Sequence, residues 1–174
     1  MGEATDKLLY GEVNPSGRLA ETFPLRLEDN PSYLNFPGDG VNVDYAEGIY
    51  VGYRYYDARK MPVRWAFGHG LSYTEYEYSN LNMPAESLDD KGCVKVTVDV
   101  KNRGSMVGKE VVQLYVSDKN GTAGRPVKEL KGFAKVELQP GETKTVEFAL
   151  TARDLSFYMK GLAIGMHLQE LTRC

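Results

Sequence analysis

The chain has 174 residues, enough for one domain or for one domain and part of a second. Apolar residues make up 42% and charged residues 26%, and 21 basic against 24 acidic residues leave a net charge of −3, which is typical of an ordinary globular protein. There is no basic excess to favour nucleic acid, no basic amphipathic segment to favour a membrane surface, and no apolar run long enough to predict a transmembrane helix.

Residues 1–70 are rich in loop signals. The pattern predicts a short helix in residues 5–12, with Thr5 or Asp6 as its cap, and a turn at Asn14-Pro15-Ser16-Gly17. Residues 23–40 contain three prolines and two glycines, which exclude a regular helix or a central strand. We expect this segment to run extended across another surface.

The stretch YAEGIYVGYRYYD, residues 45–57, holds five tyrosines and predicts a strand with both faces covered. The candidates for substrate contact are Glu47, Tyr50 and Arg54. Glycoside hydrolysis needs two carboxyl groups about 5–10 Å apart, whereas Glu47 and Asp57 would lie roughly 33 Å apart in a strand. The pattern favours a structural strand between domains, with direct substrate contact as the alternative, and it predicts no catalytic residue.

The pattern changes after Leu71 to alternation with period two. Five strands are predicted, within residues 74–83, 93–101, 110–118, 129–138 and 143–151, with no helical period between them. This predicts a β-sandwich, whose core would include Val96, Val98, Val112, Leu114, Val146 and Phe148. Gln139-Pro140-Gly141-Glu142 suits a type II turn.

A single helical turn is expected after the last predicted strand, capped by Thr151 or Asp154. Tyr158 follows it and is either a tyrosine corner or a plain core aromatic residue.

Few residues could hold a metal or a nucleotide. Cys93, Cys174, His69 and His167 lack the spacing of a metal site or a disulfide framework, so no metal or cofactor is expected. Gly68-His69-Gly70 is better explained by a tight turn than by a phosphate loop. The NGT at 120–122 matches a glycosylation acceptor but also suits a turn. The first residues lack the features of a signal peptide, and no compartment is assigned.

Several long motifs occur in one order: GEVNPSGRLAETFP, YAEGIYVGYRYYD, FGHGLSYTEYEYSNL, VTVDVKNRGSMVGKEVVQLYVSD, RPVKELKGFAKVELQPGETKTVEFAL and DLSFY. Together they resemble the C-terminal third of family 3 glycoside hydrolases, the β-glucosidase and β-xylosidase group, over residues 4–158. The resemblance implies a catalytic barrel, an α/β sandwich domain and a fibronectin type III-like domain. It also implies a retaining mechanism, whose nucleophile and acid/base motifs do not occur in this sequence.

The resemblance implies two parts of the chain. Residues 1–70 would be a loop-rich remnant of the α/β sandwich domain with a linker. Residues 71–174 would be an incomplete fibronectin type III or immunoglobulin-like β-sandwich, truncated or divergent after residue 158. The tyrosine stretch would then attach this sandwich to the catalytic body.

The expected function is that of a structural part of a β-glycoside-hydrolysing enzyme. Its partners would be the barrel and α/β sandwich domains of that enzyme, and the β-glycoside would be a substrate of the whole enzyme only. Self-association is expected for the isolated chain, because it would expose surfaces that evolved to be covered. The alternatives are an independent carbohydrate-binding module and a protein-interaction module.

Overall fold

The structure is a computed structural model, and it describes residues 2–84, 92–119 and 124–157. The chain divides into two compact units. Unit 1 comprises residues 1–17, 71–116 and 130–174, and unit 2 comprises residues 18–70 and 117–129. The predictions for Tyr158, the NGT at 120–122 and the tail from 159 to 174 lie outside the described residues. No helix in the described ranges is long and apolar enough to span a membrane.

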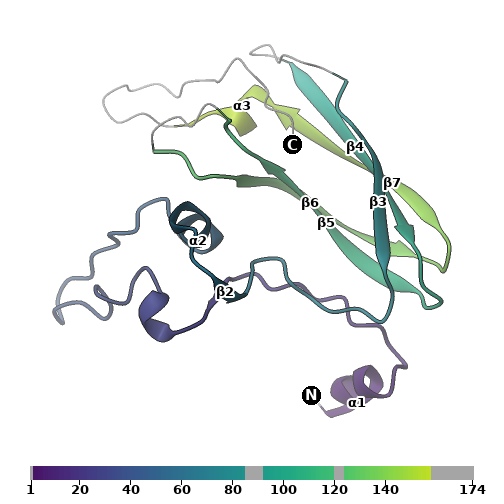
Figure 1. The fold of residues 1–174 in the computed structure, drawn as a ribbon, viewed down its shortest axis with the longest axis horizontal. Helices are drawn as coiled ribbons and strands as arrows, with labels where there is room; N and C mark the ends of the chain where they lie inside the picture. The colour runs from purple at the N-terminus through teal and green to yellow at the C-terminus, as the bar shows by residue number, and fades with distance from the viewer. Residues whose placement is uncertain (1, 85–91, 120–123, 158–174) are drawn as a thin grey trace. The chain divides into compact units, whose positions relative to one another are not determined.

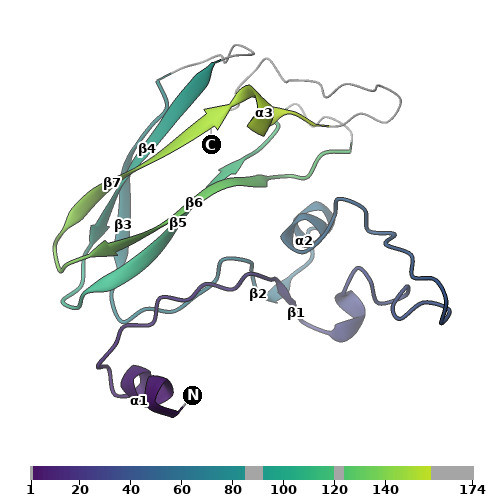
Figure 2. The same cartoon turned by 180° about the vertical axis from the view of Figure 1, so that it is seen from behind.

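Unit 1 contains two β-sheets that lie opposite each other (Figures 1 and 2). The first has the order β3-β4-β7, formed by Tyr76–Asn82, Cys93–Asn102 and Thr143–Thr151. Its strands are antiparallel, and Val96 pairs with Phe148 while Val100 pairs with Tyr78. The second sheet joins β5, Gly108–Val116, to β6, Glu129–Leu138. All five predicted strands are therefore confirmed, and the two sheets do not close, as expected for an incomplete sandwich.

The core of unit 1 consists of two clusters of buried residues between these sheets. One contains Val94, Val96, Leu114 and Leu150, and the other contains Val100, Val112, Leu138 and Val146. The alternation predicted the inward faces of β4, β5 and β7 correctly. Two of the six predicted core residues, Val98 and Phe148, are only half-buried, and both line an open cavity between the sheets.

Asn102 at the end of β4 is a fully buried polar residue that connects several elements. Its Oδ1 accepts hydrogen bonds from Thr74 Oγ1 at 2.5 Å and from the Gly104 amide at 3.0 Å. Its Nδ2 donates to the carbonyl oxygens of Met106 at 2.8 Å and Leu138 at 3.1 Å. Because both ends of the amide are satisfied, the residue can be buried without an unpaired polar group.

The turns around β7 agree with their predicted chemistry. The Glu142 amide donates to the Gln139 carbonyl, and Gly141 has φ +76°, as position three of a type II turn requires. Helix α3, Ala152–Leu155, is capped by Thr151 in a capping box with Asp154. The Thr151 amide and hydroxyl donate to Asp154 Oδ2 at 2.8 and 2.7 Å, which lowers the pKa of that carboxyl.

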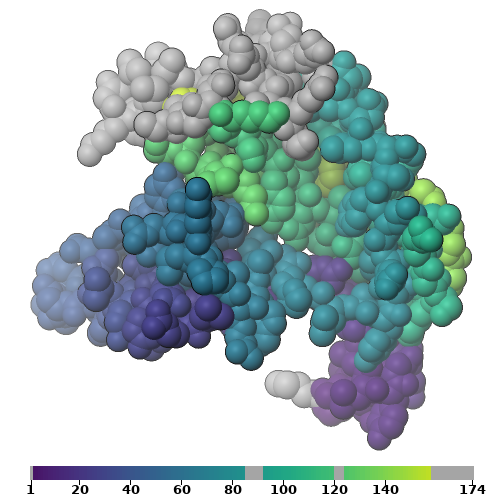
Figure 3. Space-filling model, in the orientation of Figure 1, coloured from purple at the N-terminus to yellow at the C-terminus, as the bar shows by residue number. Residues whose placement is uncertain are grey.

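The N-terminal segment forms helix α1, Gly2–Leu9, at the surface (Figure 3). The predicted helix exists, but it begins earlier than expected, so Thr5 and Asp6 lie inside it rather than at its cap. The turn predicted at residues 14–17 is wrong. Asn14 instead uses its side chain in unit 1: Oδ1 accepts from the Ser72 hydroxyl and the Tyr73 amide, and Nδ2 donates to the Val107 carbonyl. These bonds replace the local ones that would have made a turn.

Unit 2 has little regular structure. It contains a short sheet of β1, Phe23–Pro24, and β2, Val63–Trp65, a 3-10 turn η1 at Leu27–Asp29, and helix α2, Tyr53–Arg59. The remainder of residues 23–40 is irregular, as its prolines and glycines predict. A tight turn occurs at residues 67–68, slightly earlier than Gly68-His69-Gly70: the His69 amide donates to the Ala66 carbonyl at 3.0 Å, and Gly68 has φ +81°.

The strand predicted for the tyrosine stretch is wrong, because residues 46–49 form a turn and residues 53–59 form helix α2. Gly52 precedes the helix at φ 58° and ψ −132°, a conformation that glycine adopts easily and that interrupts an extended chain. Lys60 ends the helix in the left-handed region. Residues three apart share a helix face, so Tyr53 lies with Tyr56 and not with Tyr55.

Candidate functional site

A pocket of about 410 Å³ lies within unit 2, and it contains one of the residues proposed from the sequence, Glu47. The turn at 46–49 and helix α2 bring Glu47 and the aromatic residues to it. The residues that line this pocket, called the Glu47 pocket below, are Ala20, Glu21, Thr22, Asn30, Pro31, Ser32, Glu47, Val51, Gly52, Tyr53, Tyr56 and Phe67.

Glu47 is held by backbone geometry at the pocket wall. Its carbonyl accepts a hydrogen bond from the Tyr50 amide at 3.0 Å, and the Gly48 amide donates to the Tyr45 carbonyl at 3.3 Å. The carboxylate is different, because its Oε2 atom is buried and has no hydrogen-bond partner in the described part of the chain. Thr22 Oγ1 in the same wall is also buried without a partner among the described residues. The pocket therefore offers two polar oxygens whose hydrogen bonds are unmade.

Aromatic rings form much of the rest of the pocket. The Tyr53 and Phe67 rings are tilted by 40° with centroids 5.2 Å apart, and the Tyr55 and Tyr56 rings meet edge to face at 5.4 Å. Tyr56 is buried, and that burial, together with Tyr55 and Asp29 nearby, raises the pKa of its hydroxyl.

The other sequence candidates lie outside the pocket lining. The Tyr50 hydroxyl donates to the Arg125 carbonyl at 3.4 Å, and Arg54 is half-buried on α2. Asp57 is on the same helix and pairs with Lys128 at 3.2 Å. The strand-based separation of Glu47 and Asp57 does not apply, because a turn and a helix connect them.

Sequence reasoning missed Glu21 and Thr22 as neighbours of Glu47. They are 25 or more positions away in the sequence, and no motif connects them to it. The unmade hydrogen bonds are likewise a property of the folded chain. By contrast, two of the three aromatic residues of the pocket, Tyr53 and Tyr56, belong to the tyrosine-rich stretch 45–57 that the sequence analysis had singled out.

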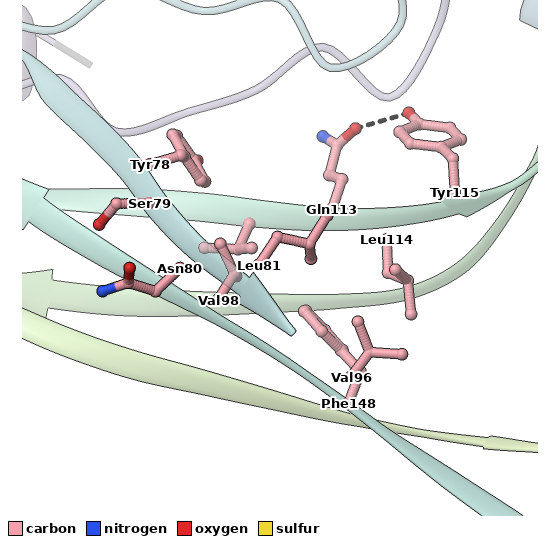
Figure 4. A pocket seen from close by; sticks show the side chains of 11 residues that line it. Tyr78, Ser79, Asn80, Leu81, Val96, Val98, Gln113, Leu114, Tyr115 and Phe148 are labelled. Carbon is pink, nitrogen blue, oxygen red and sulfur yellow. Dashed lines mark hydrogen bonds between the residues drawn. The ribbon is translucent and has the colours of Figure 1, made fainter. Parts of the chain in front are cut away.

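A second cavity, of about 550 Å³, opens between the two sheets of unit 1. Figure 4 shows Val96, Leu114 and Phe148 converging on it, with the Tyr115 hydroxyl donating to Gln113 Oε1 at 2.6 Å. Its lining is largely apolar and combines residues of both core clusters with exposed residues of β3. No Asp, Glu, His, Lys or Cys is among the residues that line this cavity, and no group of three or more His, Cys, Asp or Glu that could hold a metal occurs in the described ranges.

Two family models match the chain. Residues 1–53 match the glycosyl hydrolase family 3 C-terminal domain, and residues 110–163 match the fibronectin type III-like domain. The second match covers β5, β6, β7 and α3 of the sandwich.

Curated relatives match most of the chain. It is 54% identical over 158 residues to thermostable beta-glucosidase B of Acetivibrio thermocellus, covering 91% of this chain and 21% of that protein. It is 44% identical to beta-glucosidase BoGH3A of Bacteroides ovatus, covering 90% of this chain and 22% of that protein. The chain thus spans about a fifth of the length of these relatives.

Solved structures agree with the sequence comparison. The β-glucosidase of Kluyveromyces marxianus matches with a TM-score of 0.82 and 45% identity over 91% of this chain and 19% of that one. β-Glucosidase 3B of Thermotoga neapolitana, solved in complex with glucose, matches with a TM-score of 0.82 and 41% identity over 90% of this chain and 22% of that one. The chain therefore belongs to the family 3 glycoside hydrolases, and it corresponds to their C-terminal region, including the fibronectin type III-like domain.

Proposed function

We propose that this chain acts as the structural C-terminal part of a β-glucosidase-type enzyme that releases a terminal sugar from β-glycosides with retention. The observation that carries the proposal is the 54% identity to a β-glucosidase over 91% of the chain, in a match that covers only 21% of that protein. Its partners are the catalytic barrel and the α/β sandwich domain of the same enzyme, and the β-glycoside is bound by the whole enzyme.

The proposed division places the end of the α/β sandwich domain and its linker in residues 1–70, and the fibronectin type III-like domain in residues 71–174. The match of residues 1–53 to the family 3 C-terminal domain supports the first part. The sheets β3-β4-β7 and β5-β6 support the second.

The chain supplies structure and no catalytic carboxylate in this proposal. A retaining glycosidase needs two carboxyl groups about 5–5.5 Å apart on either side of the scissile bond. Asp57 is paired with Lys128 and is not among the residues that line the Glu47 pocket. The carboxylates that line it are those of Glu47 and the exposed Glu21. Glu47, Tyr50 and Arg54 are assigned to packing within the enzyme rather than to substrate.

An independent sugar-binding module is the second candidate, favoured by the five tyrosines of residues 45–57. A sugar platform needs exposed rings in one plane. Tyr56 is only 4% exposed, and the Tyr55 and Tyr56 rings are 83° apart, so these two tyrosines favour packing over a platform.

The test is a chimera in which this chain replaces the matching region of the Acetivibrio β-glucosidase B, assayed with an aryl β-glucoside beside the isolated chain. We expect the chimera to be active and the isolated chain to match a buffer blank. Turnover by the isolated chain that is lost in Glu47→Gln or Glu21→Gln would contradict the structural role. An inactive but folded chimera would contradict the assignment to this type of enzyme.

A further inference from the structure

Glu47 brings an unmade hydrogen bond to the Glu47 pocket. Its Oε2 atom is buried without a hydrogen-bond partner in the described ranges, and Thr22 Oγ1 in the same pocket is in the same state. An unsatisfied buried polar group costs about 1–3 kcal/mol, and a charged one costs more. Such groups in native proteins call for an explanation, and a missing donor is the simplest one.

The charge of the Glu47 pocket selects the kind of donor. Two of its twelve lining residues, Glu21 and Glu47, are acidic, and none is Lys, Arg or His. A neutral donor would satisfy the hydrogen bonds but leave the negative charge uncompensated. A cation with N–H donors satisfies both, because charge-assisted hydrogen bonds to a carboxylate are about twice as strong as neutral ones.

The aromatic lining selects among cations. Tyr53, Phe67 and the buried Tyr56 all line the pocket, and the Tyr53 and Phe67 rings lie next to each other. A guanidinium group is flat and weakly hydrated, packs against aromatic faces, and carries five N–H donors that point in several directions. The donors of a guanidinium therefore suit the unmade hydrogen bonds of Glu47 and Thr22, and its flat face suits the aromatic lining, whereas a compact ammonium is strongly hydrated and loses more on burial.

We propose that the Glu47 pocket is a socket for an arginine side chain from another segment of the longer enzyme. The source of that arginine rests on the proposed function, in which this chain works with a barrel and an α/β sandwich domain. Two observations support a source outside this chain. The relatives are about five times as long as their match to this chain. The match to the family 3 C-terminal domain ends at residue 53, within the segments that line the pocket.

The first experiment tests the chemistry on the isolated chain, without reference to enzyme activity. N-acetyl-arginine methylamide is titrated by ligand-observed NMR, beside the corresponding lysine and citrulline derivatives and glucose. We expect saturable millimolar binding of the arginine probe, at least tenfold weaker binding in Glu47→Gln, and no change in Glu28→Gln. Glu28 is an exposed glutamate of η1 outside the pocket, so it serves as the matched control.

Three results of that titration would overturn the proposal. No saturable binding of the arginine probe would mean that water fills the pocket. Equal binding of the lysine probe would remove the guanidinium assignment, and tighter binding of glucose or of the neutral citrulline probe would make the pocket a polyol or amide site.

The second experiment compares the melting temperature of Glu47→Gln in the isolated chain and in the chimera. If an arginine fills the socket only in the chimera, the substitution lowers the melting temperature there, because it removes the partner of a buried cation. In the isolated chain the same substitution leaves the melting temperature unchanged or raises it, because no cation is present there to lose its partner. A change of the same sign in both proteins would overturn the proposal. This readout needs a folded chimera but not an active one, so it is distinguishable from failure of the proposed function.

Discussion

Replacing Asn102 by alanine should destabilise unit 1 more than any surface change. The substitution removes four hydrogen bonds, to Thr74, Gly104, Met106 and Leu138, from a side chain with no exposed area. Each bond has a net value of about 0.5–1.5 kcal/mol, and each buried partner left unsatisfied costs about 1–3 kcal/mol. These contributions are not additive because they form one network, so we expect a loss of about 3–5 kcal/mol.

Urea unfolding followed by circular dichroism measures this loss, with Asn82→Ala as the matched control. Asn82 is an exposed asparagine of β3 in the same sheet, and its replacement should change stability by less than about 0.5 kcal/mol. Asn102→Asp is a further probe, because a carboxylate cannot donate to the Met106 and Leu138 carbonyls. A loss below about 1 kcal/mol in Asn102→Ala would refute the role of this network.

Three further predictions concern the cap, the cavity and the exposed surface. Asp154→Ala should lower stability by about 1 kcal/mol at pH 7. Because the folded-state pKa of Asp154 is lowered from 3.8, this contribution is present above pH 4 and is lost as the pH falls through the folded value. Melts in which the stability difference between wild type and variant grows on acidification would contradict this prediction. Phe148→Ala should lower stability by about 2–3 kcal/mol in urea melts, which is less than for a fully buried phenylalanine, because the ring lines the open cavity. The control, Phe133→Ala at an exposed position, should lower stability by less than about 0.5 kcal/mol. Residues 25–51 expose many large apolar side chains, so light scattering under reducing conditions should show self-association, and a clean 19.4 kDa monomer would argue against it.

Local patterns in the sequence were sufficient for most of unit 1. The alternation through 94–100 predicted which face of β4 is buried, because successive side chains of a strand point to opposite sides and only one side meets the core. The Pro140-Gly141 pair predicted its turn, and Thr151 predicted a helix cap, since both depend on the conformational preferences of adjacent residues. The long motifs and their order were also sufficient to indicate the family, which the comparisons with known proteins confirm.

Tertiary structure decided the remainder, because it depends on contacts between residues far apart in the sequence. The tyrosines of 45–57 have a high intrinsic preference for strands, yet Gly52 interrupts the chain, and the helix face with the buried Tyr56 and the half-buried Tyr53 favours a helix instead. Asn14 lies in a turn motif, but its side chain bonds to Ser72, Tyr73 and Val107 in the folded unit. No pattern within a short stretch of sequence predicts that Thr22 and Glu47 line the same pocket, because this pocket exists only after residues 20–67 have packed together.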